Sequence, residues 1–533
     1  MGSTIRRSVT AAVSDRRTFS EELDRNGERG LTTRELTGVN LAGDIMHKPS
    51  AAPRRHGEEG QIRSQLTVSD LPQPPGLPLL GHLPALARGG TMHRTLSDWR
   101  DRFGPTFRVR LGRKDAVVTS ASAIVDTVLR ERPDTFRRAR SLSDLIVELG
   151  ASGLFDAEGA DWQRLRRMAT RGLNSGQLRD SYSSIARSTG RLRERWEGLA
   201  GARVPVLEDL MRYTLEVAVA LTMGHDLDAV RRADDDGLHQ RLPLVFDTLT
   251  RRTNSPFPYW RWMRLPADRR VDAVVAEASA LIRELYADSR RRMGTGEKPR
   301  TYLDSLAMAS LDGDEHITEG DLIGTILNMM IAGEDTAAAT TAWAMHHLAG
   351  HPEVQQRVRA EAAGVLGAEG YPAEPTDLAR LPYAEAVVKE TIRLNPVSPF
   401  ILLEAVTDTT VVDGTTELHI RRGTVIVLLL THGSDRDPLR YPDPGRFEPE
   451  RWLSSAARTS PQQQPFMPFG GGPRFCPGRN LALMESTLVV AMTCHRFTVE
   501  PDTSAGPVGE RVTLAVLPTH LNVRLHPASA SAQ

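Results

Sequence analysis

Residues 469–478 read Phe-Gly-Gly-Gly-Pro-Arg-Phe-Cys-Pro-Gly, and they set one cysteine, Cys476, in a glycine-rich loop. Three consecutive glycines permit backbone conformations that other residues avoid, and Gly478 allows a tight turn against a flat ligand. Backbone N–H groups in such a nest, with Arg474 beside them, favour the thiolate over the thiol and donate hydrogen bonds to the sulfur. The apolar periodicity of residues 480–492 predicts a helix whose N-terminal dipole points at this sulfur. The loop is therefore predicted to bind a metal through the thiolate.

A second unusual pattern, Ala332-Gly-Glu-Asp-Thr336, lies inside a helix that the apolar periodicity predicts over Glu319–Leu348. A glycine in a helix interior costs about 1 kcal/mol relative to alanine, so Gly333 calls for a reason. Gly333 and Thr336 share one face, where the threonine hydroxyl can bond back to a carbonyl and the helix opens locally. The alternative is an ordinary helix with an exposed acidic pair and a packed threonine.

The cysteine loop resembles the haem-binding signature of the cytochrome P450 family at five positions, Phe469, Gly472, Arg474, Cys476 and Gly478. The resemblance extends over residues 71–527. It implies that Cys476 is the axial ligand of the iron of haem b, iron protoporphyrin IX, because a cysteine thiolate holds the haem in this family. A lone cysteine is otherwise a small buried hydrophobe, and we assign that role to Cys494, the only other cysteine.

The same resemblance implies catalytic and haem-binding roles elsewhere in the chain. In the family, the threonine that matches Thr336 hydrogen-bonds dioxygen, the co-substrate, and the acid that matches Asp335 relays protons. Trp162 and Arg166 match a pair that faces the haem propionates, which are anions that need hydrogen-bond donors. The alternative for this pair is a packed tryptophan beside a basic, solvated helix face.

One departure from the family pattern concerns the propionates. Many relatives carry a further propionate-binding arginine in the strand after the helix that contains Arg393, but residues 396–420 contain no arginine or lysine. We therefore expect the propionates to depend more on contacts with Trp162, Arg166 and Arg474.

Glu390 and Arg393 stand three residues apart on a predicted helix, which by itself is typical of an ordinary surface ion pair. Arg451 matches the third member of a Glu–Arg–Arg triad in the cytochrome P450 family. The resemblance therefore implies a buried structural network that stabilises the haem-loop side of the fold.

The resemblance also predicts which side chains line a substrate pocket. Most of them are apolar, so the substrate is expected to be a lipophilic small molecule, although most pockets have apolar walls. The predicted lining residues are Asn328, Met329, Ala332, Val397, Ser398, Phe400 and Leu514.

Composition limits the class of protein. With 67 basic and 67 acidic residues among 533, the chain has no net charge, which argues against a nucleic-acid partner. Two cysteines exclude a cysteine-ligated iron–sulfur module, and no Gly-x-Gly-x-x-Gly dinucleotide fingerprint is present. Electrons, if needed, must therefore come from another protein, and the resemblance implies NAD(P)H acting through a ferredoxin and its reductase or a flavoprotein reductase. No run of about 18 apolar residues exists, so we expect no transmembrane anchor and a soluble, cytoplasmic protein.

The fold class is predicted to be mainly α with a small β region, matching the cytochrome P450 architecture in which haem lies between the long central helix and the cysteine-loop helix. Residues 1–70 are predicted to be a disordered polar extension, residues 71–527 a single catalytic domain and residues 528–533 a tail. Periodicity predicts further helices at Met92–Phe103, Glu208–Met223, Val271–Arg292 and Glu353–Leu366. It predicts strands at Thr106–Leu111, Ala116–Thr119, Pro399–Val406 and Glu417–Leu430.

The function implied by the resemblance is that of a haem-thiolate monooxygenase, which uses dioxygen and two external electrons to hydroxylate or epoxidise its substrate. The abundance of arginine over lysine points to a GC-rich bacterial genome and to specialised metabolism. One alternative is a haem-thiolate peroxygenase, coupling or rearrangement enzyme without net oxygen insertion. Another is a haem-based gas sensor or carrier.

Overall fold

The central helix of the fold is α13, Glu319–Gly350, and the residues around Thr318 set its start. Thr318 Oγ1 accepts the backbone N–H of Asp321 at 3.1 Å, and the Asp321 carboxylate accepts the backbone N–H of Thr318 at 3.0 Å. This reciprocal cap satisfies two of the N–H groups that a helix start leaves free. The computed structural model describes residues 64–87, 91–112, 114–232, 237, 241–253, 255, 257–313, 317–432, 434–453, 466–513 and 515–528.

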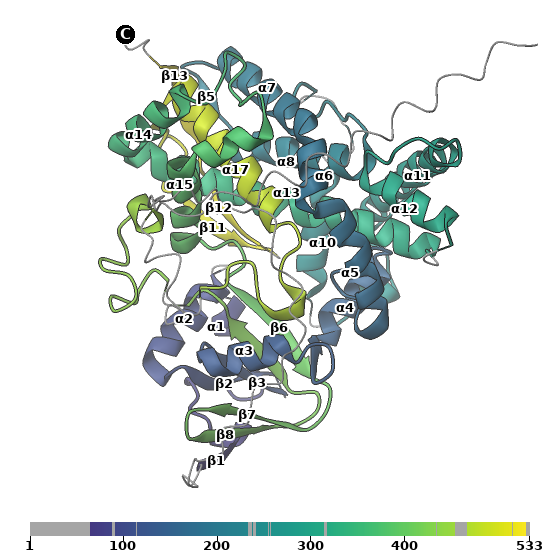
Figure 1. The fold of residues 1–533 in the computed structure, drawn as a ribbon. Coiled ribbons are helices and arrows are strands. Elements are labelled where there is room, and N and C mark those ends of the chain that lie inside the picture. Colours follow the sequence, from purple (N-terminus) through teal and green to yellow (C-terminus); the bar gives the residue numbers. More distant parts are fainter. Residues whose placement is uncertain are drawn as a thin grey trace, which may run out of the picture. The chain divides into compact units, whose positions relative to one another are not determined.

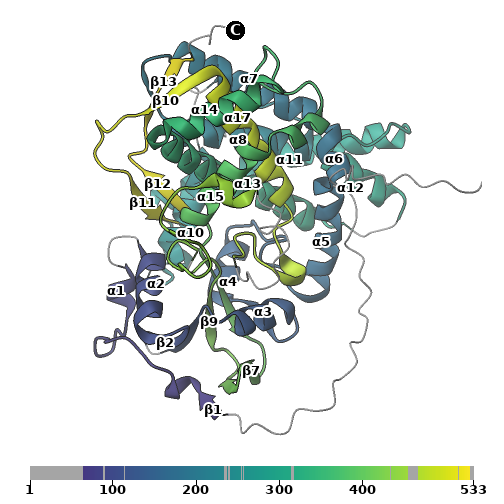
Figure 2. The same ribbon diagram turned by 60° about the vertical axis from the view of Figure 1, so that its left-hand side comes forward.

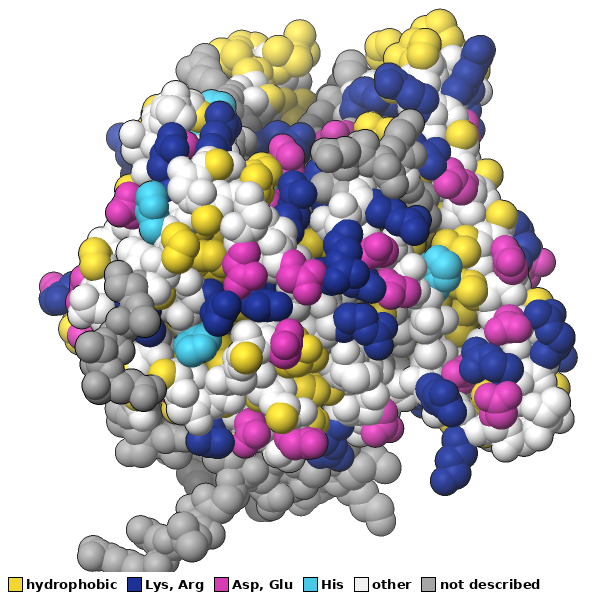
Figure 3. Space-filling model, turned by 90° about the horizontal axis from the view of Figure 1, so that it is seen from above, with side chains coloured by type: hydrophobic (Ala, Val, Ile, Leu, Met, Phe, Trp, Pro, Cys, Tyr) yellow, Lys and Arg dark blue, Asp and Glu magenta, His cyan; other side chains and the backbone are white. Residues whose placement is uncertain are grey.

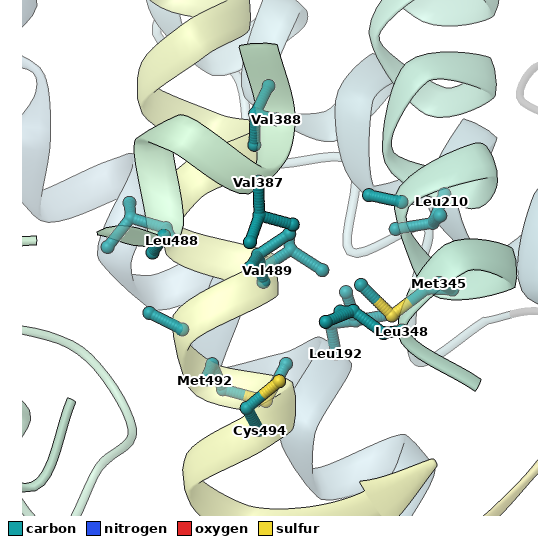
Figure 4. Close-up of a cluster of buried hydrophobic side chains, with 14 of the residues drawn as sticks. Leu192, Leu210, Met345, Leu348, Val387, Val388, Leu488, Val489, Met492 and Cys494 are labelled. Atoms are coloured by element: carbon teal, nitrogen blue, oxygen red, sulfur yellow. The ribbon is translucent and has the colours of Figure 1, made fainter. Parts of the chain in front are cut away.

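Helices make up most of this described part and pack around α13 (Figure 1). Their largest common core takes buried side chains from α7, α8, α13, α15 and α17, part of which Figure 4 shows. In chain order the helices are α1 Leu83–Ala87, α2 Met92–Phe103, α3 Ser122–Arg130, α4 Arg140–Glu148, α5 Gly159–Leu173, α6 Ser175–Asp180, α7 Tyr182–Gly198, α8 Val206–Met223, α10 Pro243–Thr253, α11 Pro266–Gly294, α12 Tyr302–Leu311, α13, α14 Pro352–Ala363, α15 Pro382–Leu394 and α17 Arg479–Arg496.

The strands form small sheets, and the largest has five strands in the order β2-β3-β9-β6-β4. Figures 1 and 2 show this sheet together with α2 and α3 at one side of the helical part. The others have the orders β1-β8-β7, β10-β13-β5 and β11-β12. The strands are β1 Ser64–Thr67, β2 Thr106–Leu111, β3 Lys114–Thr119, β4 Phe136–Arg138, β5 Arg203–Val204, β6 Phe400–Ala405, β7 Thr409–Asp413, β8 Thr416–Ile420, β9 Val425–Leu429, β10 Phe497–Pro501, β11 Gly509–Val512, β12 Val516–Thr519 and β13 Val523–Pro527.

The mainly helical fold class is confirmed, and each helix predicted from periodicity is present with ends shifted by a few residues. The strand predicted over Glu417–Leu430 is wrong in one respect, because it is two strands, β8 and β9. Gly423 adopts φ +80° between them, and the Asp408 carboxylate accepts the Arg422 backbone N–H at 2.7 Å. A turn with a left-handed residue interrupts the apolar run, which glycine permits.

The start of the folded part also differs from the prediction. β1 pairs in parallel with β8, with Ser64 opposite Thr416, so residues 64–67, which the prediction placed in the disordered extension, form a paired strand. Four residues are too short to show a periodicity in the sequence, and their partner lies far along the chain. The rest of the predicted extension, residues 1–63, and most of the predicted tail, residues 529–533, lie outside the described residues.

The described helices include none that is both long enough and apolar enough to cross a bilayer. Acidic and basic side chains are interspersed on the face shown in Figure 3, as the zero net charge of the whole chain would suggest.

Candidate functional site

The cysteine loop is held in one conformation by its glycines and by α3. Gly470 and Gly472 adopt φ +72° and φ +63°, which L side chains rarely take. A Cβ atom on Gly472 would lie 2.5 Å from the backbone oxygen of Leu129 in α3, so only glycine fits there. The Cys476 backbone N–H donates to the Phe469 carbonyl at 2.8 Å and closes the loop. The cysteine is thus presented at a fixed position just before α17.

The backbone of Gly478 does not itself require glycine. This residue is the N-cap of α17 with φ −82°, an ordinary value, so no left-handed turn requires glycine here. A Cβ atom on Gly478 would lie 3.9 Å from Cys476 Sγ, beside the sulfur. That distance is an ordinary van der Waals contact.

The pKa of the Cys476 thiol differs from what the sequence led us to expect. Burial raises the pKa of the thiol above its ordinary value, an effect that outweighs the lowering by the Gly478 and Arg479 backbone N–H groups and by Arg166. The loop by itself therefore favours the thiol, contrary to the sequence prediction. A bound metal ion deprotonates a coordinating thiol outright, so the N–H groups and Arg166 would assist a thiolate that a metal creates.

α13 is buried on most faces but carries one accessible stripe in its middle. Ala332 is exposed, and Asn328, Met329, Gly333 and Thr336 are half-buried, although the flanking turns are buried. Positions 328, 332 and 336 are four apart and lie on one face. The accessible residues thus lie in the middle of α13, between turns that are buried.

The acidic pair of α13 is buried, so the alternative of an exposed acidic pair is wrong. Burial raises the pKa of Glu334 well above its ordinary value, with help from Asp335. Burial also raises the pKa of Asp335 to about 7; Arg511 of β11 opposes this shift and Asp247 of α10 adds to it. Glu334 Oε1 and Asp335 Oδ1 have no hydrogen-bond partner among the described residues. The Thr336 hydroxyl donates to the Ala332 carbonyl at 2.7 Å, as predicted.

Three arginines donate hydrogen bonds to the carboxylate of Glu158, the N-cap of α5. Its Oε1 accepts from Arg132 Nη2 at 3.0 Å and from the Arg138 backbone N–H at 2.8 Å, while its Oε2 accepts from Arg474 Nη2. The Nε atoms of Arg132 and Arg474 are buried without a partner among the described residues. Burial and the other arginines lower the pKa of Arg474 to about 10. This cluster has a surplus of positive charge that further carboxylates would neutralise.

Sequence reasoning missed two arginines of the cluster, Arg132 and Arg138. Arg138 is in β4, opposite Leu403 of β6, the strand that lacks the expected arginine. Its guanidinium carbon lies 3.6 Å from the centre of the Phe155 ring, and its Nε donates to the Phe155 carbonyl at 2.9 Å. Burial, with Arg132 and Arg474, lowers the pKa of Arg138 to about 9. β4, the strand that pairs with β6, thus supplies the arginine that β6 lacks.

Trp162 and Arg166, the predicted propionate pair, lie in α5 next to this cluster and the cysteine loop. The Arg474 guanidinium carbon is 4.5 Å from the centre of the Trp162 ring, and that of Arg166 is 4.6 Å from the centre of the Phe475 ring. The structure therefore brings Trp162, Arg166, Arg474 and Cys476 together.

The predicted Glu–Arg–Arg network is buried and its charges are satisfied. Arg393 binds Glu390 through two hydrogen bonds of 2.8 and 2.7 Å, and both side chains are 0% exposed. Glu390 also accepts from Arg451 Nε at 3.3 Å and from Trp452 Nε1 at 2.9 Å. Arg393 donates to the carbonyls of Ser434, Pro444 and Arg446. The network therefore joins α15 to the irregular segment that leads to the cysteine loop.

The predicted pocket residues are placed by different contacts. The Asn328 amide donates to the Ala151 carbonyl at 2.6 Å and accepts the Phe155 N–H at 2.8 Å, so it also braces the segment after α4. Val397, Ser398 and Phe400 are half-buried, and the Val397 carbonyl accepts the Val516 N–H of β12 at 2.9 Å. Leu514 lies outside the described residues.

A comparison with protein families decides the identity of the fold. The family model for cytochrome P450 matches residues 71–523. The chain belongs to the cytochrome P450 family. Human 25-hydroxyvitamin D-1 alpha hydroxylase, mitochondrial, is 28% identical to this cytochrome P450 over 517 residues, covering 90% of this chain and 97% of the relative.

Two plant relatives have similar identities. Carnosic acid synthase of Rosmarinus officinalis is 29% identical over 460 residues, covering 81% of this chain and 87% of the relative. A flavonoid 3'-monooxygenase of Oryza sativa subsp. japonica is 29% identical over 457 residues, covering 80% and 84%. The family and the names of these relatives establish a haem-thiolate monooxygenase and leave no support for a gas sensor or carrier.

The residues present fit a haem. The accessible stripe of α13 and the half-buried Cys476 are surfaces that a flat group would cover. The arginine cluster at Glu158 has unpartnered buried donors for carboxylates.

Proposed function

We propose that this cytochrome P450 inserts one oxygen atom of dioxygen into a lipophilic small molecule by hydroxylation or epoxidation. The accessible stripe on α13, which ends at Thr336 beside two buried acids, is the observation that carries the proposal. The names of the relatives, which include a vitamin D hydroxylase and a flavonoid monooxygenase, support a small organic substrate. The half-buried Met329 and Val397 supply apolar surface for it.

Haem b, when bound, supplies the activation of dioxygen, and Cys476 would hold its iron. Arg138, Arg166 and Arg474 would bind its carboxylates, because buried guanidinium groups form strong charge-assisted hydrogen bonds. The Thr336 hydroxyl can turn from the Ala332 carbonyl to donate a hydrogen bond into the accessible space.

Asp335 is suited to proton transfer. A carboxyl whose pKa is about 7 is divided between its two protonation states near neutral pH. Its unpartnered Oδ1 can therefore carry a proton and release it.

Electrons would come from NAD(P)H through a separate ferredoxin or flavoprotein system, since this chain has neither a dinucleotide fingerprint nor cysteines for an iron–sulfur cluster. The bacterial origin, specialised metabolism and cytoplasmic location inferred from the sequence stay predictions.

Isotopically labelled dioxygen tests the proposed reaction. Candidate lipophilic compounds are first selected by the change they cause in the haem spectrum, and turnover is then started with NAD(P)H and a surrogate reductase. One labelled oxygen atom per product supports the proposal. Product that forms only with added peroxide, or without labelled oxygen, favours the peroxygenase or rearrangement alternative.

The pH dependence of turnover should report on Asp335. Protonated Asp335 is the donor, so the rate is expected to fall as the pH rises above about 7. Asp335→Asn should lower the rate by about a hundredfold and remove this fall, since a positioned acid contributes roughly 10²–10⁴-fold. The measurement is product formation against pH.

Variants of the two charged residues that shift the pKa of Asp335 provide a matched test. Asp247 raises the pKa of Asp335 and Arg511 lowers it, and these two residues pair at 3.1 Å. Asp247→Asn should therefore move the fall in rate to lower pH, and Arg511→Gln to higher pH. Identical profiles in both variants would contradict the assignment of this pH dependence to Asp335.

Arg138 is expected to retain the haem. Arg138→Leu should accelerate haem transfer to apomyoglobin by about tenfold or more, because a hydrogen bond to a charged group contributes about 1.5–3 kcal/mol. Arg140→Leu, on the same segment but with a 61% exposed side chain, is the control and should leave the rate unchanged. Equal transfer rates for wild type and Arg138→Leu would show that Arg138 does not bind a propionate.

A further inference from the structure

A cavity lies where the last turns of α13 meet the end of β10 and the start of β13, and none of the described site residues lines it. Its volume is about 390 Å³, which is within the range that small-molecule sites occupy. The walls come from α13 and from residues 501–508 and 521–523. Most of the wall is apolar, through Ala349, Pro501, Pro507, Val508, Leu521 and Val523.

Three polar side chains also line the cavity, and each has an acceptor atom without a hydrogen bond in the described part of the chain. Asn522 is 8% exposed; its Nδ2 donates to the His520 carbonyl at 3.4 Å, and its Oδ1 has no partner there. Asp502 is 7% exposed, and its Oδ2 has none either. The ring nitrogens of His346 are equally unpaired, and the ring stands edge-on to Trp343 with 5.6 Å between the ring centres. Buried acceptors are normally satisfied, so the cavity lacks hydrogen-bond donors.

The electrostatics of the cavity favour a cation. Hydrogen bonds from Ser504 lower the pKa of Asp502, so this carboxylate is charged at neutral pH. Burial lowers the pKa of His346, with help from His351, so the imidazole is neutral and can accept a hydrogen bond. Ala349 belongs to the last turn of α13, which is the negative end of the helix dipole.

Two arginines reduce the negative charge of Asp502 without lining the cavity. Arg524 of β13 is exposed, and its Nη2 lies 3.2 Å from Asp502 Oδ2. Arg203 of β5 also acts electrostatically on this carboxylate. A carboxylate has about four acceptor positions, so Asp502 can still accept from a donor inside the cavity.

We propose that this cavity binds a small organic cation, a protonated primary amine carried on an apolar body such as an aromatic ring. An ammonium group has three donors and no acceptor, which matches the acceptors of Asn522, Asp502 and His346. The apolar body packs against the prolines and aliphatic side chains of the wall. A neutral ligand of the same shape would lose the charge-assisted hydrogen bond, and an anion would be repelled by the carboxylate. The site is separate from the cysteine loop and does not depend on the proposed reaction.

Fluorine NMR of the full-length holoenzyme tests the proposal, with para-trifluoromethylbenzylamine as the probe. The haem pocket is first saturated with clotrimazole, because the amine would otherwise also bind at the iron. The fluorine line of the probe should broaden and shift in a saturable way. The neutral analogue, para-trifluoromethylbenzyl alcohol, should bind about tenfold or more weakly, since hydrogen bonds to charged groups are the stronger ones.

Three variants place the binding in this cavity. Asp502→Asn keeps an oxygen for the Ser504 backbone N–H but removes the charge, and it should weaken binding of the amine about tenfold. Val508→Phe fills the cavity and should abolish binding. Glu500→Gln makes the same kind of charge change in β10 on a 59% exposed side chain that pairs with His526, and it should leave binding unchanged.

The carbon monoxide spectrum of each variant shows whether the haem-thiolate centre is intact, and no substrate or electron donor is needed. Absence of saturable binding in wild type would overturn the proposal. So would binding that both Asp502→Asn and Val508→Phe leave unchanged. Equal binding of the amine and the alcohol would show that the ligand is not selected by its charge, which also contradicts it.

Discussion

The variant Cys476→Ser is expected to lose the Soret band that marks thiolate-ligated haem when the enzyme is reduced with dithionite under carbon monoxide. A serine hydroxyl is a far weaker ligand for the iron than a thiolate, and the loop contains no second cysteine. The loop backbone should be unaffected, because its shape depends on Gly470, Gly472 and the hydrogen bond from the Cys476 backbone N–H. The absorption spectrum of the purified variant measures the effect.

Cys494→Ser is the matched control for the same spectrum. Cys494 is 0% exposed in the α17 core, and burial raises the pKa of its thiol to about 12, so it carries no thiolate at neutral pH. This variant should keep the band, at some cost in stability from a polar atom in the core. A normal band in Cys476→Ser, or no band in well-folded wild type, would contradict the assignment of Cys476 as the ligand.

The largest expected effect on stability is that of Glu390→Ala. The substitution leaves the buried guanidinium of Arg393 without its carboxylate and removes the acceptor of Arg451 and Trp452. Breaking a buried ion pair from one side destabilises by roughly 3–5 kcal/mol. The measurement is the urea midpoint of unfolding, and the segment before the cysteine loop should become sensitive to protease.

Glu385→Ala provides the comparison on the same helix. Glu385 pairs with Lys389 at 2.7 Å, and the two side chains are 41% and 33% exposed. Such a surface pair contributes about 0.3–0.5 kcal/mol, so its loss should barely change the midpoint. Similar midpoints for Glu390→Ala and Glu385→Ala would mean that the Glu–Arg–Arg network does not stabilise the fold.

Local patterns in the sequence determined several of these features. The glycines at positions 470 and 472 and the cysteine at 476 lie within seven residues, so their spacing alone defines a loop. The helical repeat over α13 and the four-residue spacing within it likewise depend on neighbours along the chain. The shape of the cysteine loop, the central helix and the helical class could therefore be predicted without coordinates.

The tertiary structure decided which charges are buried and which strands meet. Arg138 reaches the arginine cluster because β4 pairs with β6, a partner more than 250 residues away along the chain. The pKa of Asp335 depends on burial and on Asp247 and Arg511 from two other elements. Tryptophans two positions apart, Trp260 and Trp262, differ only in what packs against them. The burial of a side chain and the pKa of a charged group depend on all the residues that surround it in space. Those residues come from distant parts of the sequence, so they become known only when the chain is folded.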